Sequence, residues 1–133
     1  MSTAQELGRR AVKCARWRWM PGMLTVQWWD GEPHPYRCRR HWRGHVAIGQ
    51  CTDGRPEDNA EFCLPDLTDS ATVGCLLALV REAWGDCEAH VTPMGGYDGD
   101  FGWRCWCATE THSYHFRGET EAEALVAALE AAP

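Results

Sequence analysis

Residues 36–51, YRCRRHWRGHVAIGQC, hold the side chains of this sequence that are most suited to chemistry. Five arginine or histidine side chains and one tryptophan lie between Cys38 and Cys51. The spacing Cys38-x2-His41-x3-His45 offers three zinc ligands, and Cys51 offers a fourth. The same segment could instead form a basic hairpin that contacts a partner, or a solvated loop. The cysteine spacing, composition and charge of the rest of the chain bear on which interpretation is favoured.

The zinc interpretation lacks the spacing of a zinc finger, because no second cysteine lies close upstream of Cys38 and no CxxC occurs. Cys105 and Cys107 could supply a pair from one strand, with His112 or His115 across a hairpin, but these histidines point to opposite faces. Cysteine is also a common core residue. We expect no cofactor, and the alternative is a zinc module that contacts nucleic acid. Its ligands would be Cys38, His41, His45 and Cys51.

The composition bounds the class of protein. A chain of 133 residues with 44% hydrophobic and 24% charged residues is large enough for one folded domain, residues 1–133. No apolar run approaches the roughly 20 residues of a membrane span, and the first residues lack the apolar region of a secretion signal. We therefore expect a cytoplasmic protein whose eight cysteines are thiols or metal ligands rather than disulfides.

The charges are unevenly distributed along the chain. Residues 1–50 hold nine basic and three acidic side chains, a balance of +6, whereas residues 51–133 hold four basic and sixteen acidic ones, a balance of −12. Either the folded protein has a polarised surface that docks on a charged partner, or the two halves neutralise each other across the fold. The net charge of −6 argues against direct binding to nucleic acid.

Three segments carry apolar residues at helical spacing. The first contains Leu7, Ala11 and Cys14 and should end before Pro21. The third begins with a T-x-x-E capping box at Thr120. Its buried stripe is expected to be Ala122, Leu125, Val126 and Leu129.

The second helix has the clearest signals. Thr68, Asp69 and Ser70 are candidates for its N-cap, and Gly85 can close it. Gly74 in the interior of this helix lowers the stability of the helix by roughly 1 kcal/mol relative to alanine. Its apolar stripe is Val73, Leu76, Leu77, Val80 and Trp84.

Strand-like segments lie between the helices, at 23–29, 45–50 and 87–93, and residues 102–108 and 112–117 are predicted to form a hairpin. The order of elements predicts an α+β fold, an antiparallel β-sheet with about three flanking helices in a single compact domain. Alternation places Trp103, Cys105 and Cys107 on one face of the first hairpin strand and His112, Tyr114 and Phe116 on one face of the second. The expected core comprises Leu7, Leu76, Leu77, Val80, Leu125 and Leu129 of the helices against Leu24, Val26, Val91 and Phe116 of the strands.

Three phrases of the sequence together resemble a known family. They are ELGRRAV leading to WRWMPGM, LPDLTDSATVGCLLALVREAWG, and TEAEALVAALEAAP. These phrases cover well under half of the chain and resemble the phage α-β-α sandwich proteins, which are small accessory proteins of tailed phages and prophages. The resemblance implies a phage-encoded protein in a bacterial host cell, and it offers no catalytic residue to carry over. Residues 36–51 and 105–115 lie outside the matching phrases.

The absence of a nucleophile elbow, a phosphate loop or a metalloprotease motif indicates a binding protein rather than an enzyme. By analogy with small phage accessory proteins, the expected partner is a host defence protein such as a CRISPR nuclease complex, which this protein would inhibit. The candidate contact residues are exposed aromatics and arginines, namely Trp29, Arg40, Trp42, Arg43 and Tyr97. The acidic residues around the starts of the second and third helices form an alternative contact surface, and the tryptophans are compatible with a homodimer.

Overall fold

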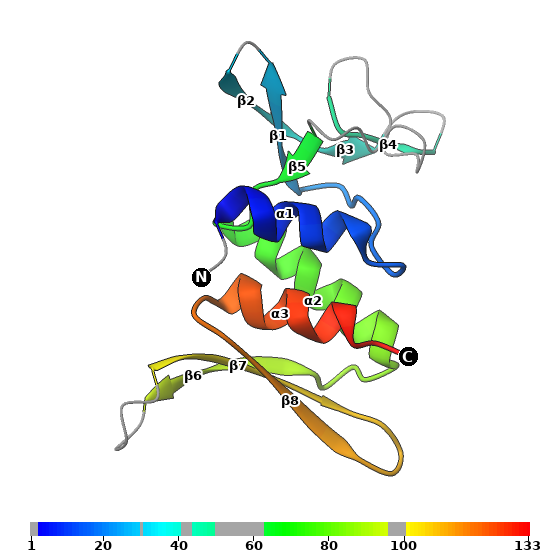
Figure 1. Cartoon of the computed structure of the whole chain (residues 1–133). Coiled ribbons are helices and arrows are strands. Elements are labelled where there is room, and N and C mark those ends of the chain that lie inside the picture. Colours follow the sequence, from blue (N-terminus) through cyan, green and yellow to red (C-terminus); the bar gives the residue numbers. More distant parts are fainter. Residues whose placement is uncertain (1–2, 30, 41–43, 50–62, 96–100) are drawn as a thin grey trace.

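The helices of this protein lie between two antiparallel sheets (Figure 1). The computed structural model describes residues 3–29, 31–40, 44–49, 63–95 and 101–133. In these ranges the elements follow in the order α1 (Ala4–Lys13), β1 (Leu24–Trp29), β2 (Glu32–Arg37), β3 (Arg39–Arg40), β4 (Val46–Ala47), β5 (Cys63–Pro65), α2 (Ser70–Trp84), β6 (His90–Gly95), β7 (Phe101–Ala108), β8 (Ser113–Gly118) and α3 (Glu121–Glu130).

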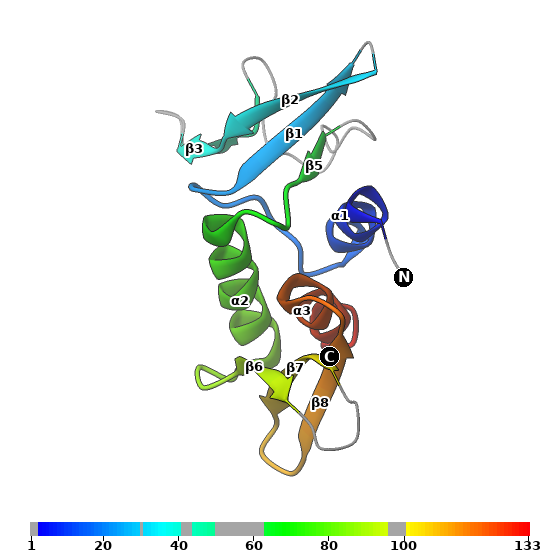
Figure 2. The same cartoon turned by 90° about the vertical axis from the view of Figure 1, so that its left-hand side faces the viewer.

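The strands form separate sheets rather than one. The first sheet has the order β2-β1-β5, the second has the order β6-β7-β8, and β3 pairs with β4. Figure 2 shows the helices between the first and second sheets, with α2 and α3 on one side of the second sheet. The predicted α+β class with three helices is therefore confirmed, although the single expected sheet is divided. Among the described residues, every helix is too short or too polar to cross a membrane.

Strand β2 carries two prolines and was not among the predicted strands. Pro33 lies opposite Trp28, and Pro35 lies opposite Val26. Because β2 is the outer strand of its sheet, its prolines can occupy ladder positions that require no N–H donor toward β1. The turn between β1 and β2 is short, since Trp29 pairs with Glu32. Gly31 in this turn has a positive φ of 73°, which glycine adopts readily.

The buried face of β1 differs from the prediction. Leu24 and Val26 were expected in the core, but both are half-buried, whereas Thr25 and Gln27 on the opposite face are buried. The reason is that a second layer covers the Thr25 and Gln27 face: a Cβ built on Gly49 would stand only 2.5 Å from the Gln27 amide nitrogen. The alternation of the strand was therefore correct, and the face that becomes buried was not.

Two thiols satisfy the buried polar groups of β1. The hydroxyl of Thr25 lies 2.9 Å from Cys38 Sγ, and Gln27 Nε2 donates to Cys63 Sγ over 3.4 Å. A buried hydroxyl or amide without a partner would cost roughly 1–3 kcal/mol. These cysteines therefore have a structural role beneath the first sheet.

The main core lies between α2, α3 and the second sheet. Helix α2 begins at the N-cap Asp69 and ends at Gly85 in the left-handed conformation, as predicted, and Thr120 caps α3. Trp84 Nε1 donates to the carbonyl oxygen of Ala128 over 2.8 Å, which ties α2 to α3. Leu77, Val91 and Phe116 are only half-buried. The predicted core residues that are buried are Leu7, Leu76, Val80, Leu125 and Leu129.

Asp69 joins α2 to the first sheet. Its carboxylate accepts two hydrogen bonds from the Arg37 guanidinium, at 2.6 and 3.0 Å, and also accepts from the backbone N–H and the hydroxyl of Thr72. The Thr72 hydroxyl in turn accepts from the backbone N–H of Leu24. The Arg37 guanidinium and the Thr72 donors hold the pKa of Asp69 well below its usual range.

The ion pairs connect the two halves of the sequence. The three pairs between described residues are Arg10–Glu130, Arg18–Glu82 and Arg37–Asp69, and each joins a cation of residues 1–50 to a carboxylate of residues 51–133. Part of the charge asymmetry along the chain is therefore neutralised by folding.

Gly118 permits the close approach of α3 to β8. A Cβ at this position would stand 2.4 Å from the backbone nitrogen of Ala124, whereas a Cβ at Gly74 in α2 would meet no described atom within 4 Å. We predict that Gly118→Ala lowers the free energy of unfolding by about 1–3 kcal/mol, and that Gly74→Ala raises it by about 1 kcal/mol. Urea unfolding of both variants measures this difference, and equal effects of the two would contradict the proposed contact.

The Asp69–Arg37 pair should make stability depend on acid pH. Because the pKa of Asp69 is lower in the folded chain than the roughly 3.9 of an unfolded aspartate, its contribution is present above pH 4 and is lost as the pH falls below it. Asp69→Asn keeps a good N-cap, removes the charge, and replaces one of the two oxygens that accept from Arg37 by an N–H donor. We expect it to cost about 1 kcal/mol at pH 7 and progressively less as the pH falls from 4 toward the lower pKa of folded Asp69. A cost that stays constant over this range in urea unfolding would refute the ionic origin.

Candidate functional site

The predicted basic contact segment is only partly described. Arg40 lies on β3, where it pairs with Val46 and is exposed. Trp29 is the last residue of β1, and its side chain lies outside the described part of the chain. The other predicted contact residues, Trp42, Arg43 and Tyr97, also lie outside the described residues. The predicted contact surface therefore stays a prediction.

The predicted zinc ligands are similarly divided. Cys38 is 2% exposed and contacts Thr25, and burial raises the pKa of its thiol, which disfavours the thiolate that zinc requires. His45 is half-buried, whereas His41 and Cys51 lie outside the described residues. Where the structure describes the chain, no three histidine, cysteine or acidic side chains are arranged to hold a metal ion. Zinc binding at residues 38–51 remains untested.

The second cysteine pair is part of the core. Cys105 and Cys107 face α3 from β7, are 0% and 2% exposed, and have their sulfurs 3.8 Å apart. The contact with Cys105 and burial together raise the pKa of Cys107, so this thiol stays protonated. His115 lies opposite Trp106, on the other face of the sheet, and therefore cannot complete a metal site with these thiols.

The second sheet exposes a face that carries cationic and aromatic side chains. Helices α2 and α3 cover one side of β6, β7 and β8, and the other side is uncovered by any described helix (Figures 1 and 2). We call this uncovered side the open face. It is defined by the residues His90, Thr92, Arg104, Trp106, His115 and Arg117.

The open face consists of two cross-strand rows. One row is His90–Trp106–His115 and the next is Thr92–Arg104–Arg117, with the central residue of each row on β7. The Arg104 guanidinium carbon lies 5.3 Å from the centre of the Trp106 ring, as does the His115 ring. The indole N–H of Trp106 donates to the Thr92 hydroxyl over 3.3 Å. These contacts hold a half-buried tryptophan among planar cationic and imidazole groups.

The open face has an excess of positive charge. Neither row contains a carboxylate, and Arg104 lies directly opposite Arg117, an arrangement of like charges that is unfavourable without an anion. Neither arginine belongs to an ion pair between described residues, and the buried Nε of Arg104 has no described hydrogen-bond partner. The neighbouring carboxylates, Asp86 and Glu88, precede β6, and Asp86 accepts backbone N–H groups of Glu88 and Ala108. The face is therefore electrostatically suited to an anion.

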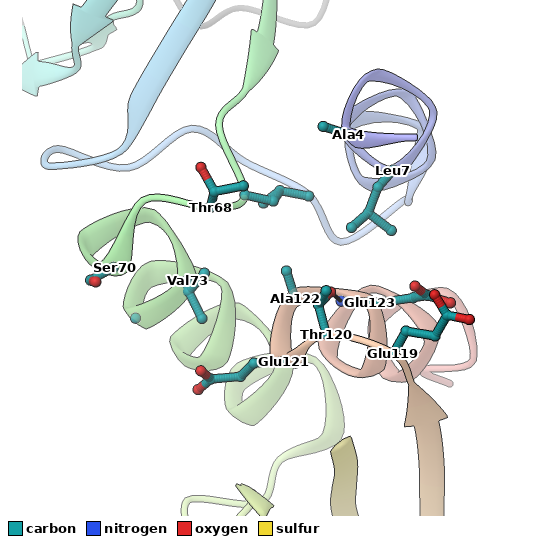
Figure 3. Close-up of a pocket in the computed structure, with 12 residues that line it drawn as sticks. Ala4, Leu7, Thr68, Ser70, Val73, Glu119, Thr120, Glu121, Ala122 and Glu123 are labelled. Carbon is teal, nitrogen blue, oxygen red and sulfur yellow. Dashed lines mark hydrogen bonds between the residues drawn. The ribbon is translucent and has the colours of Figure 1, made fainter. Parts of the chain in front are cut away.

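A hollow lies where the first turns of the three helices meet (Figure 3). Its volume is about 670 Å³, and Leu7, Leu67, Val73 and Ala122 supply apolar surface to it. Glu119, Glu121 and Glu123 also line it, which makes one side acidic. Carboxylates are stabilised at a helix start whatever their other role, so the hollow by itself does not indicate a ligand.

The open face was not predicted from the sequence. The alternation in residues 102–108 and 112–117 assigned the cysteines and Phe116 to one side, and the residues between them were not considered as a surface. The alternation of side chains along a strand could have identified these residues, because it places Arg104 and Trp106 on one face of the first strand and His115 and Arg117 on one face of the second. The register between the strands, which brings these pairs together, needed the structure.

Comparisons with protein-family models, with curated proteins and with solved structures gave no match for this chain. The resemblance to phage α-β-α sandwich proteins therefore remains a prediction from three phrases of the sequence.

The two tryptophans of β7 should differ in their contribution to stability. Trp103 packs against the core on the covered side, whereas Trp106 lies on the open face. We expect Trp103→Ala to lower the free energy of unfolding by about 3 kcal/mol, and Trp106→Ala by about 1 kcal/mol, because it loses mainly the contacts to Arg104 and His115. Urea unfolding with far-UV circular dichroism compares them. A larger cost for Trp106→Ala would show that Trp106 is primarily a structural residue.

Proposed function

We propose that this protein is a non-enzymatic binding protein that docks through its open face on an anionic surface of another macromolecule. The observation that carries the proposal is the pair of opposed arginines, Arg104 and Arg117, beside the half-buried Trp106 and without a carboxylate in either row. Tryptophan and arginine are the residues that most often dominate binding energy at macromolecular interfaces. An anion between the two guanidiniums would relieve their mutual repulsion.

The biological setting that we propose is inhibition of a host defence complex by a phage-encoded protein. Its support is the resemblance of three sequence phrases to phage accessory proteins, together with the separation of charge along the chain. A CRISPR nuclease complex is a suitable partner class because it holds guide RNA and a displaced DNA strand, which present phosphates to a cationic surface. The residues of the open face are then the contact residues of the inhibitor.

Charge reversal on the open face tests the proposal. Heparin serves as a generic polyanion, and we expect Arg104→Glu with Arg117→Glu to abolish the retention of the protein on a heparin column at low salt. The matched control is Arg9→Glu with Lys13→Glu, which changes the net charge equally at two exposed residues of α1 and should preserve most of the retention. Circular dichroism verifies that both variants are folded. Equal retention of the two double variants would remove the open face as a docking surface.

A further inference from the structure

We infer that the partner of the open face is a single-stranded nucleic acid, with one base stacked on Trp106 and phosphates held by Arg104 and Arg117. This inference rests on the proposed function and specifies the partner. From the sequence, direct binding to nucleic acid was not expected, because the net charge of the whole chain is negative. The open face is a local exception, because both of its rows lack carboxylates.

The aromatic part of the open face favours a base over an acidic peptide. Trp106 lies on the central strand, and its indole N–H is held by Thr92, so the ring is fixed in place. His115 is inclined to the indole by 48° with ring centres 5.3 Å apart, and Arg104 lies over the same indole. Bases of single-stranded nucleic acids stack on such aromatic rings and guanidinium planes. Aspartate and glutamate side chains carry charge but no ring of this kind.

The positions of the arginines suit phosphates next to the stacked base. The arginine row lies two residues along the strand from the Trp106 row, a distance of roughly 7 Å. A guanidinium binds phosphate oxygens through two parallel N–H donors, and neither arginine belongs to an ion pair between described residues. Because Arg104 and Arg117 are direct cross-strand neighbours, phosphates bound to them would reduce the repulsion between the two guanidiniums.

The shape of the open face favours a single strand over a duplex. Bases in a duplex are stacked on each other and paired, so their faces are inaccessible to a half-buried tryptophan on a sheet. The grooves of DNA admit a helix or a two-stranded ribbon rather than the broad face of a three-stranded sheet. Unpaired bases can turn toward the sheet and reach Trp106.

The two arginines also determine how strongly binding should depend on salt. Each phosphate neutralised in a single strand contributes about −0.7 to the slope of log affinity against log salt, so two contacts give about −1.4. A fourfold increase in salt should then weaken binding about sevenfold. The carboxylates at Asp86 and Glu88, next to the open face, keep the affinity modest.

Fluorescence anisotropy with four labelled probes tests the inference. The probes are a mixed-sequence 12-nucleotide DNA, the corresponding RNA, the duplex of the DNA, and a poly-glutamate peptide of similar charge. We expect binding of at least one single strand with a slope near −1.4, weaker binding of the duplex and no binding of the peptide. Trp106→Ala should weaken single-strand binding roughly tenfold, and Trp106→Phe should retain most of it because phenylalanine still stacks. Arg104→Glu with Arg117→Glu should abolish binding, unlike Arg9→Glu with Lys13→Glu.

The outcomes separate this inference from the proposed function. Poly-glutamate binding that is equal to single-strand binding and insensitive to Trp106→Ala would overturn the nucleic-acid inference and leave the open face as a site for an acidic protein. Equal binding of the duplex would overturn the preference for a single strand. Failure of all four probes to bind would overturn the inference, and loss of heparin retention only in the open-face variant would still preserve the proposed function.

Discussion

Helix α3 packs against β7 and β8, and the side chains buried there belong to the same cluster as those of α2. The approach is close because Gly118 offers no Cβ at the point where α3 begins. Cys105 and Cys107 are buried on the covered side of β7. This packing fixes which side of the second sheet is covered, and therefore which side is available to a partner. The open face is exposed because α2 and α3 pack on the opposite side of the second sheet.

The buried cysteines among the described residues are part of the packing of the fold. Four of those described are buried, and each has a neighbour in the fold: Cys38 contacts Thr25, Cys63 accepts from Gln27, and Cys105 lies beside Cys107. The thiols of Cys38 and Cys63 are hydrogen-bond partners for the Thr25 hydroxyl and the Gln27 amide. A methyl group in place of either thiol would leave that polar group without a partner. The number of cysteines suggests metal chemistry when the sequence is read alone, whereas the surroundings of these four thiols show packing.

Folding neutralises part of the charge asymmetry along the sequence. The ion pairs at Arg10, Arg18 and Arg37 each connect the basic half to the acidic half. Acidic side chains gather at the start of α3 beside the hollow of Figure 3, where the helix end stabilises them. The cations of the open face, Arg104 and Arg117, come from the acidic half of the sequence.

The sequence by itself determined the helices and the hairpin, because caps and periodicity are local: Asp69, Gly85 and Thr120 lie where they were predicted. It also separated the two sides of the strands that it predicted, since alternation is a property of the extended backbone. It did not determine which side is buried. Thr25 and Gln27 are buried because a distant segment covers them, and β2 forms despite its prolines because it is an edge strand. Only the tertiary structure placed Arg104 beside Arg117 and Trp106 beside His115, because strand register and helix packing depend on contacts between residues far apart in the chain.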